Sequence, residues 1–166
     1  MPMSMTPDQY FDAFVRGNYE EFANDPGCVR RAFNAVVAAS HQADHCFQYY
    51  KKFYPSKVNS FGTIGNYVEF LSISTNGSFR DVRSIANAYK HLYTGNNSKH
   101  AEESSISSAG TIESVRFSNS GVVELAQQTS DDTDSVIYTT KAGERRCLKT
   151  ALDVVFRFWE NQFLRE

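Results

Sequence analysis

The stretch that decides the fold is Cys28–Phe53, with the sequence CVRRAFNAVVAASHQADHCFQYYKKF. Its apolar residues recur at helical spacing, and its alanines favour a helix and let a neighbouring helix approach closely. The pattern ends at Tyr54-Pro55, because the residue before a proline is pushed out of the helical region. We therefore predict one long helix that is central to the fold. Its inner face is formed by Val29, Phe33, Val36, Ala43, Phe47 and Tyr50.

A helix is also predicted before this stretch. Thr6-Pro7-Asp8 provides a hydroxyl cap, a proline at the first helical position and a carboxylate near the positive end of the helix dipole. Apolar residues then follow at helical spacing for four to five turns. Asn24-Asp25-Pro26-Gly27 breaks this first helix.

Two shorter helices are predicted after the long one. Residues 63–74 fit either a strand or a helix, because Gly62 and Gly65 weaken the helical pattern, and we favour a short helix. Asn76-Gly77 predicts a turn, and Ser78 followed by Asp81 resembles a capping box. The next helix is expected over Phe79–Tyr93.

In the last third of the chain, the spacing of the apolar residues is no longer that of a helix throughout. Residues 96–110 are serine-rich with almost no apolar anchor, which indicates a mobile loop. Alternating apolar residues over about 112–141, with turn residues at Ser118–Gly121, predict a small antiparallel meander. A wide apolar face predicts a final helix over about 144–163. The expected fold is mainly α, an antiparallel bundle of four to five helices with this meander inserted before the last helix.

Length and composition bound the class of protein. The chain has 166 residues and a net charge of −2, and a chain of this length suits a single domain over 1–166 that needs no metal to hold its core. The composition excludes a disordered or fibrous polypeptide, and no apolar run approaches the roughly 20 residues that span a bilayer. We expect no membrane contact.

The expected compartment is the cytoplasm. Met1–Asp8 has no basic residue that would begin a signal peptide. Cys28, Cys46 and Cys147 are odd in number, far apart and without a CxxC pair, which argues against a disulfide framework and a zinc knuckle. The chain has no P-loop, GxGxxG, GxSxG or EF-hand motif, so no cofactor and no familiar nucleotide-dependent or serine-hydrolase chemistry is expected.

A strip of polar residues on the Phe79–Tyr93 helix is the main candidate binding site. Arg80, Arg83, Asn87, Lys90 and His91 lie away from the apolar stripe if each residue advances by about 100°. Their donors could hold a phosphate or a carboxylate, including those of a nucleic acid. The alternative is an ordinary solvated helix face.

Two other clusters have simpler explanations. His41 and His45 share a helix face beside Asp44, the spacing of a helical metal site, but no motif supplies a further ligand. We favour solvated or hydrogen-bonded side chains there and predict no metal site. A basic cluster at the start of the final helix opposes the helix dipole, and its simplest partners are Glu144 or the acidic residues at 131, 132 and 134. This cluster consists of Lys141, Arg145, Arg146 and Lys149.

The segment FRDVRSIANAYKH, Phe79–His91, resembles the helix ending in N-x-x-K-H of a group of uncharacterised bacterial helical-bundle proteins. That helix is similar to the fourth-helix region of HEPN domains, the higher eukaryote and prokaryote nucleotide-binding bundles, many of which are RNases or toxin-like partners. The likeness consists of Asn87, Lys90 and His91 together with the long alanine-rich helix, and it covers under half of the chain.

The sequence departs from the active members of that family at one position. Active HEPN RNases have an arginine that is followed, after four to six intervening residues, by a histidine, and a polar residue often lies next to the arginine. Asn87 fits the polar position and His91 the histidine, but Ala86 occupies the arginine position and Arg83 lies too far upstream. Without a guanidinium at the cleaved phosphate, the charge of the transition state would lack its stabiliser. The resemblance therefore implies a non-catalytic relative.

Two hypotheses for the function follow. The favoured one is a non-catalytic, HEPN-like binding or interaction module whose partner is a protein, an RNA or a second copy of the chain. The alternative is a metal-independent RNase or nucleotide-modifying enzyme in which His91 acts as acid or base and Arg83 or Lys90 holds the phosphate.

Overall fold

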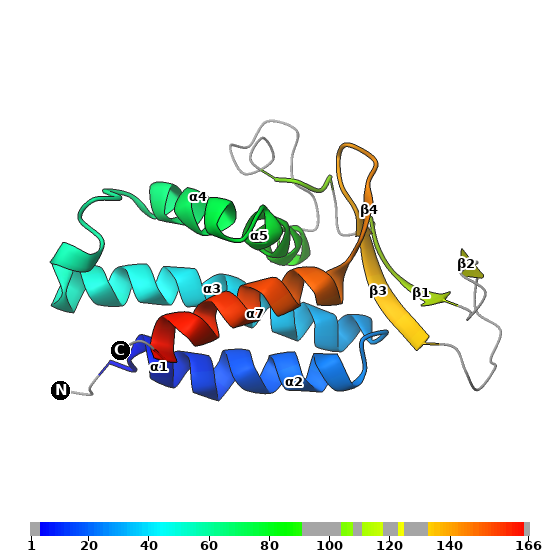
Figure 1. Cartoon of the computed structure of the whole chain (residues 1–166), viewed down its shortest axis with the longest axis horizontal. Coiled ribbons are helices and arrows are strands. Elements are labelled where there is room, and N and C mark those ends of the chain that lie inside the picture. Colours follow the sequence, from blue (N-terminus) through cyan, green and yellow to red (C-terminus); the bar gives the residue numbers. More distant parts are fainter. Residues whose placement is uncertain (1–3, 91–103, 108–110, 118–122, 125–132, 165–166) are drawn as a thin grey trace.

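The chain is mainly helical, with a small antiparallel sheet at one end of a helical bundle (Figure 1), which confirms the predicted fold class. The computed structural model describes residues 4–90, 104–107, 111–117, 123–124 and 133–164. Within these residues the elements are α1 (Pro7–Tyr10), η1 (Phe11–Arg16), α2 (Gly17–Asn24), α3 (Val29–Phe53), η2 (Pro55–Lys57), α4 (Ile64–Ser74), α5 (Ser78–Lys90), β1 (Ile112–Phe117), β2 (Val123–Glu124), β3 (Thr133–Thr139), β4 (Arg145–Cys147) and α7 (Leu148–Leu164).

The predicted first helix is present as α1, η1 and α2. The Thr6 side chain accepts a hydrogen bond from the Gln9 amide, and the Gln9 side chain accepts one from the Thr6 amide, so a capping box begins the helix. The middle segment, η1, is a π-helix, in which each turn is wider than an α-helical turn. The helical stretch ends before Asp25, as the Asp-Pro-Gly sequence predicts.

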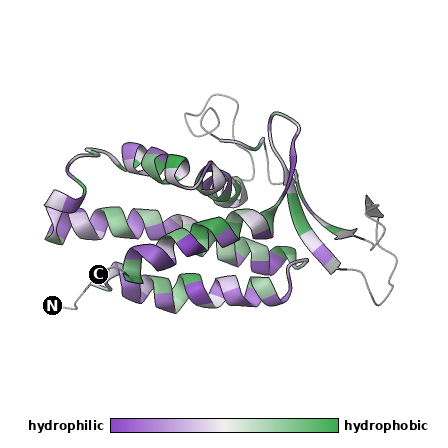
Figure 2. Cartoon of the chain, in the orientation of Figure 1, coloured by the Kyte–Doolittle hydropathy of each residue, from purple (hydrophilic) through white to green (hydrophobic). Residues whose placement is uncertain are grey.

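The predicted long helix, α3, lies at the centre of the bundle (Figure 1). Its alanines are largely buried, and hydrophobic and hydrophilic residues alternate along the helices around it (Figure 2). One predicted core residue differs, because Val29 in the first turn of α3 is exposed. It is the first residue of α3, directly after the turn that follows α2.

The prediction of helices on both sides of the Asn76-Gly77 turn is confirmed. Thr63 caps α4 by accepting a hydrogen bond from the Asn66 amide. The turn has left-handed backbone conformations at Asn76 (φ 51°) and Gly77 (φ 87°). The Thr75 hydroxyl then accepts a hydrogen bond from the Phe79 amide at 3.0 Å. α5 is described as far as Lys90, so the predicted extension to residue 93 lies outside the described residues.

The sheet is antiparallel, as predicted, with strand order β2-β1-β3-β4. β1 pairs with β2 through Phe117 and Val123, in agreement with the predicted hairpin, whose turn lies outside the described residues. β1 also pairs with β3 along six positions from Ile112 to Phe117, so the two-residue β2 is an edge strand and β1 lies inside the sheet. A meander in strict sequence order would instead have placed β2 between β1 and β3.

The predicted start of the final helix is wrong. Arg145–Cys147 is an extended strand, β4, which pairs with β3, and α7 begins only at Leu148. The backbone of Thr140 donates to the Glu144 carbonyl at 2.8 Å, and Gly143 takes a φ of 84°, so a tight turn folds these residues back onto β3. Pairing with the sheet therefore replaces one turn of helix.

The predicted mobile loop has an apolar anchor. Ile106 is fully buried and Ser104 is also buried. The Ser105 amide donates to the Ser84 hydroxyl at 3.0 Å, and its carbonyl accepts from the Lys141 amide at 2.8 Å. Residues 104–107 are therefore fixed between α5 and the β3–β4 turn, whereas the remainder of 96–110 lies outside the described residues.

One cluster of buried side chains joins the sheet to the bundle. It includes Phe22, Ile106, Tyr138 and Trp159, which come from α2, the 104–107 segment, β3 and α7. Of the helices that the structure describes, none combines the length and apolar character needed to cross a bilayer.

Candidate functional site

Both arginines of the predicted polar strip on α5 are paired with carboxylates. Arg80 Nη2 lies 2.9 Å and 2.7 Å from the two carboxylate oxygens of Glu69 on α4. Arg83 forms a bidentate pair with Asp44 on α3, with Nη1–Oδ2 at 3.0 Å and Nη2–Oδ1 at 3.1 Å. The Arg83 side chain is 23% exposed. These pairs connect α5 to α4 and α3.

The other residues of the strip are placed only in part. Asn87 is half-buried on α5, and Lys90 is the last residue of that helix. His91 lies outside the described residues. The structure therefore places Arg80 and Arg83 against carboxylate partners, and the predicted grouping with Lys90 and His91 lies outside what it describes.

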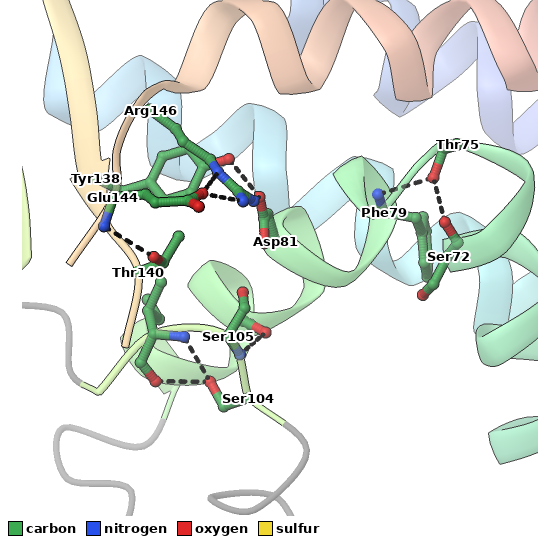
Figure 3. A network of polar contacts seen from close by, with 12 residues as sticks. Ser72, Thr75, Phe79, Asp81, Ser104, Ser105, Tyr138, Thr140, Glu144 and Arg146 are labelled. Atoms are coloured by element: carbon green, nitrogen blue, oxygen red, sulfur yellow. Dashed lines mark hydrogen bonds and ion pairs between the residues drawn. The ribbon is translucent and has the colours of Figure 1, made fainter. Parts of the chain in front are cut away.

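A polar network connects α5 to the sheet (Figure 3). The carboxylate of Asp81, which is 3% exposed, accepts a hydrogen bond from the Tyr138 hydroxyl at 2.6 Å and from Arg146 Nη1 at 2.7 Å, both on Oδ2. Arg146 also donates to Glu144 through Nε at 3.0 Å and through Nη2. Asp81 thus accepts two bonds from the sheet side. The expected capping box is wrong, because the Ser78 amide donates to the Thr75 carbonyl and the Asp81 amide donates to the Gly77 carbonyl.

The network shifts the pKa values of two of its members. Burial is the largest cause of the raised pKa of Tyr138, and the hydrogen bond to Asp81 raises it further. The hydrogen bond that Arg146 donates to Asp81, followed by that to Glu144, raises the pKa of Arg146. Tyr138 therefore stays neutral and Arg146 stays charged throughout the ordinary pH range.

An open pocket of about 310 Å³ lies beside this network, between the first turns of α5 and α7. The Arg146 guanidinium is already shared by the carboxylates of Asp81 and Glu144. One positive and two negative side chains therefore leave the network with one net negative charge. Its described lining contains no histidine that could act as a general base. The residues that supply its polar atoms are Asn76, Ser78, Asp81, Tyr138, Arg146, Cys147 and Thr150.

The predicted basic cluster is distributed over β4, α7 and the turn before them. Arg145 pairs with Glu113 at 3.1 Å, and Lys149 pairs with Asp153 at 3.0 Å. The predicted partner Glu144 is confirmed for Arg146. Because β4 replaces the expected first helical turn, Arg145 and Arg146 do not oppose the dipole of α7 from within the helix.

The histidines of α3 take no part in a metal cluster among the residues that the structure describes. Asp44 is paired with Arg83, and His41 is exposed. His45 Nε2 lies 2.7 Å from the Met5 carbonyl, to which it donates, and its ring stacks on Tyr10 with centroids 4.8 Å apart. The hydrogen-bonded alternative therefore describes His45.

His45 belongs to a row of aromatic rings that sequence reasoning missed. We call these rings the aromatic row: Phe14, Tyr10, His45, Tyr49, Phe53 and Tyr54. The centroid distances are 5.1 Å from Phe14 to Tyr10, 6.4 Å from His45 to Tyr49, 4.8 Å from Tyr49 to Phe53 and 6.2 Å from Tyr49 to Tyr54.

A sequence signal for part of this row exists. His45, Tyr49 and Phe53 are spaced four residues apart, which places them on one face of a helix. The contribution of Tyr10 and Phe14 has no such signal, because it depends on how α1 and η1 pack against α3. Asp81 likewise bonds to partners that lie far from it in the sequence, Tyr138 and Arg146.

In comparisons with known proteins, no family model, no curated protein and no solved structure matches this chain.

Proposed function

We propose that this chain is a cytoplasmic binding module, HEPN-like in its helices, that performs no catalytic step of its own. The observation that supports this proposal is the bidentate pair between Arg83 and Asp44.

A phosphodiester-cleaving site needs cationic donors directed at the phosphate oxygens on which charge develops. Arg83 is the arginine nearest in sequence to His91, and two of its N–H groups are directed at Asp44 instead. Releasing Arg83 for a phosphate would leave the Asp44 carboxylate beside α5 without its partner. The polar side chains of α5 are therefore better suited to holding the bundle together than to stabilising a transition state.

The surface of the chain offers groups suited to binding. Phe14, Phe53 and Tyr54 of the aromatic row are 44%, 45% and 54% exposed, and such large exposed apolar side chains in groups mark interaction sites. A binding module needs these groups and a stable scaffold, and it needs no activated nucleophile.

The test is an RNA-cleavage assay with the purified chain and end-labelled single-stranded RNA. We expect the RNA to remain intact over prolonged incubation at neutral pH. Degradation that is lost in a folded His91→Ala variant, and retained in a variant of the exposed His41 on α3, His41→Ala, as the matched histidine control, would overturn the proposal. Circular dichroism establishes that both variants are folded.

A further inference from the structure

We infer that the pocket between α5 and α7 binds a small zwitterion, a free α-amino acid, with the ammonium of the ligand on Asp81 and its carboxylate on the first turn of α7. This inference rests on the proposed function of a binding module, to which it adds a ligand class and a site.

The pocket contains a buried carboxylate with one oxygen open to a ligand. Asp81 is 3% exposed and lines the pocket. Tyr138 and Arg146 both donate to its Oδ2, and no donor among the described residues reaches its Oδ1. Oδ1 is not one of the enclosed polar atoms without a partner, so solvent reaches it, and the pocket is the opening that Asp81 lines. An ionised oxygen of this kind forms its strongest hydrogen bond with a charged donor.

The charge of the network favours a cationic group at this oxygen. The Arg146 guanidinium bonds to both Asp81 and Glu144, so one positive side chain serves two negative ones (Figure 3). It has no charge left over for an anionic ligand, and the network as a whole repels a phosphate or a nucleotide. An ammonium at Asp81 Oδ1 supplies the missing positive charge.

The α7 side of the pocket suits a carboxylate. It is formed by Cys147, Thr150 and Ala151, at the beginning of the 17-residue α7. The first N–H groups of a helix have no acceptor within the helix, and they carry part of the positive charge of its dipole. Cys147 lies directly before the helix, where an oxygen-bearing side chain usually caps these groups, and a thiol is only a weak acceptor. The Thr150 hydroxyl is a further donor for a carboxylate.

The two sides of the pocket together select the ligand. A simple anion would face the Asp81 carboxylate, and a simple cation would face the positive end of the α7 dipole. A molecule that carries an ammonium next to a carboxylate satisfies both sides, and a free α-amino acid is a small molecule of this kind. The volume of about 310 Å³ lies at the lower end of the roughly 300 to 1,000 Å³ that small-ligand sites occupy.

Isothermal titration calorimetry with the purified full chain tests this inference. The standard L-amino acids are titrated one at a time. The tightest binder is then compared with its N-acetyl derivative, which has no ammonium, and with its α-amide, which has no carboxylate. We expect saturable binding of an amino acid at one site. Each derivative should bind about 10- to 150-fold more weakly, as expected for loss of a hydrogen bond to a charged group.

Matched variants locate the site. Asp81→Asn should weaken binding by a similar factor, whereas Asp44→Asn should leave it unchanged, because Asp44 is also paired with an arginine but does not line the pocket. Thr150→Val keeps the shape of the side chain and removes its hydroxyl, so it should weaken binding about 3- to 10-fold. Its control is Ser60→Ala, at an exposed hydroxyl outside the pocket. Thr150→Val and the ligand derivatives keep the test decisive if Asp81→Asn does not fold.

Three results would overturn the inference: no amino acid binds, a derivative binds as tightly as its parent, or the pocket variants bind as tightly as their controls. If no amino acid binds and RNA stays intact, the proposed binding module stands and its partner contacts another surface. If an amino acid binds and nuclear magnetic resonance shows that the chain converts it into another compound, the pocket inference holds and the proposed non-catalytic function fails.

Discussion

At the scale of single residues, Asp81 is the side chain that connects α5 to the sheet. It is almost fully buried and accepts bonds from a neutral hydroxyl and a charged guanidinium at the same oxygen. A buried carboxylate of this kind is tolerated because its partners supply both hydrogen bonds and a compensating charge. The network therefore makes α5 and the sheet depend on each other.

Replacement of Asp81 by asparagine removes the negative charge that Arg146 Nη1 faces. We expect Asp81→Asn to lower the free energy of unfolding by about 1.5 to 3 kcal/mol, the range for hydrogen bonds to charged groups. Urea denaturation measures the change. Glu144→Gln is the control, because the Glu144 side chain is 59% exposed and its pair with Arg146 should contribute less than about 1 kcal/mol. Equal losses in the two variants would contradict a special role for Asp81.

Tyr19 makes the free energy of unfolding depend on pH in the alkaline range. Its hydroxyl donates to Asp153 Oδ1 at 2.6 Å, and burial, followed by this hydrogen bond, raises the pKa of Tyr19 to about 12. Above pH 10 the unfolded chain loses the tyrosine proton while the folded chain keeps it, so the folded state binds more protons. The contribution of Tyr19 is therefore fully present below pH 10 and is lost as pH rises to about 12.

This pH dependence is checked with Tyr19→Phe, which keeps the ring that stacks on Phe156. We expect the urea midpoint of the variant to fall less steeply than that of the unmodified chain between pH 10 and 12. Parallel profiles in this window would show that Tyr19 is not responsible. Because other tyrosines titrate in both proteins, the difference between the profiles is the quantity to compare.

At the scale of elements, periodicity and caps predicted the helices well. Thr6 and the Asn76-Gly77 turn each act locally, so the neighbouring sequence contains the information that they need. The start of α7 was wrong because Arg145–Cys147 takes its conformation from β3, a partner that no local pattern identifies. The anchoring of Ile106 was missed for a similar reason, since a single apolar residue in a serine-rich segment becomes significant only when a core accepts it.

Two glycines of the α2–α3 region should respond oppositely to the same substitution. Gly17 has a helical φ and no atom near the position of an added Cβ, so Gly17→Ala should stabilise the chain by about 0.5 to 1 kcal/mol. At Gly27 an added Cβ would overlap with the side chain of Asp134 and come within 3.1 Å of its Cα. Gly27→Ala should therefore destabilise the chain by about 1 to 3 kcal/mol.

Thermal or urea unfolding of the two variants measures both signs. The Gly27 effect has a structural consequence that can also be observed, because the Pro26 carbonyl accepts from the Val136 amide and the Gly27 carbonyl accepts from Ser114. Hydrogen exchange at Val136 should accelerate in Gly27→Ala and remain unchanged in Gly17→Ala. A stable Gly27→Ala protein with normal exchange would contradict the close contact between this turn and the sheet.

At the scale of the whole molecule, the candidate sites were the least predictable feature. The sequence shows which residues of α5 are polar, but the role of each depends on a partner that lies far away in the sequence, as Asp44 does from Arg83. The aromatic row likewise needs α1 to pack beside α3 before its rings form one strip. Propensity and spacing describe one element at a time, whereas a site depends on which faces of several elements meet.

The shared core predicts how the whole molecule unfolds. Trp159 is the single tryptophan and is fully buried, in edge contact with Phe79 of α5, and the same core includes Tyr138 of the sheet. Because sheet and bundle bury side chains in common, we expect urea transitions followed by Trp159 fluorescence and by far-ultraviolet circular dichroism to coincide. Asp81→Asn should move both transitions to lower urea together. A dichroism transition that separates from the fluorescence transition would show that one part unfolds alone, and the core shared by Tyr138 and Trp159 would then not be sufficient to couple them.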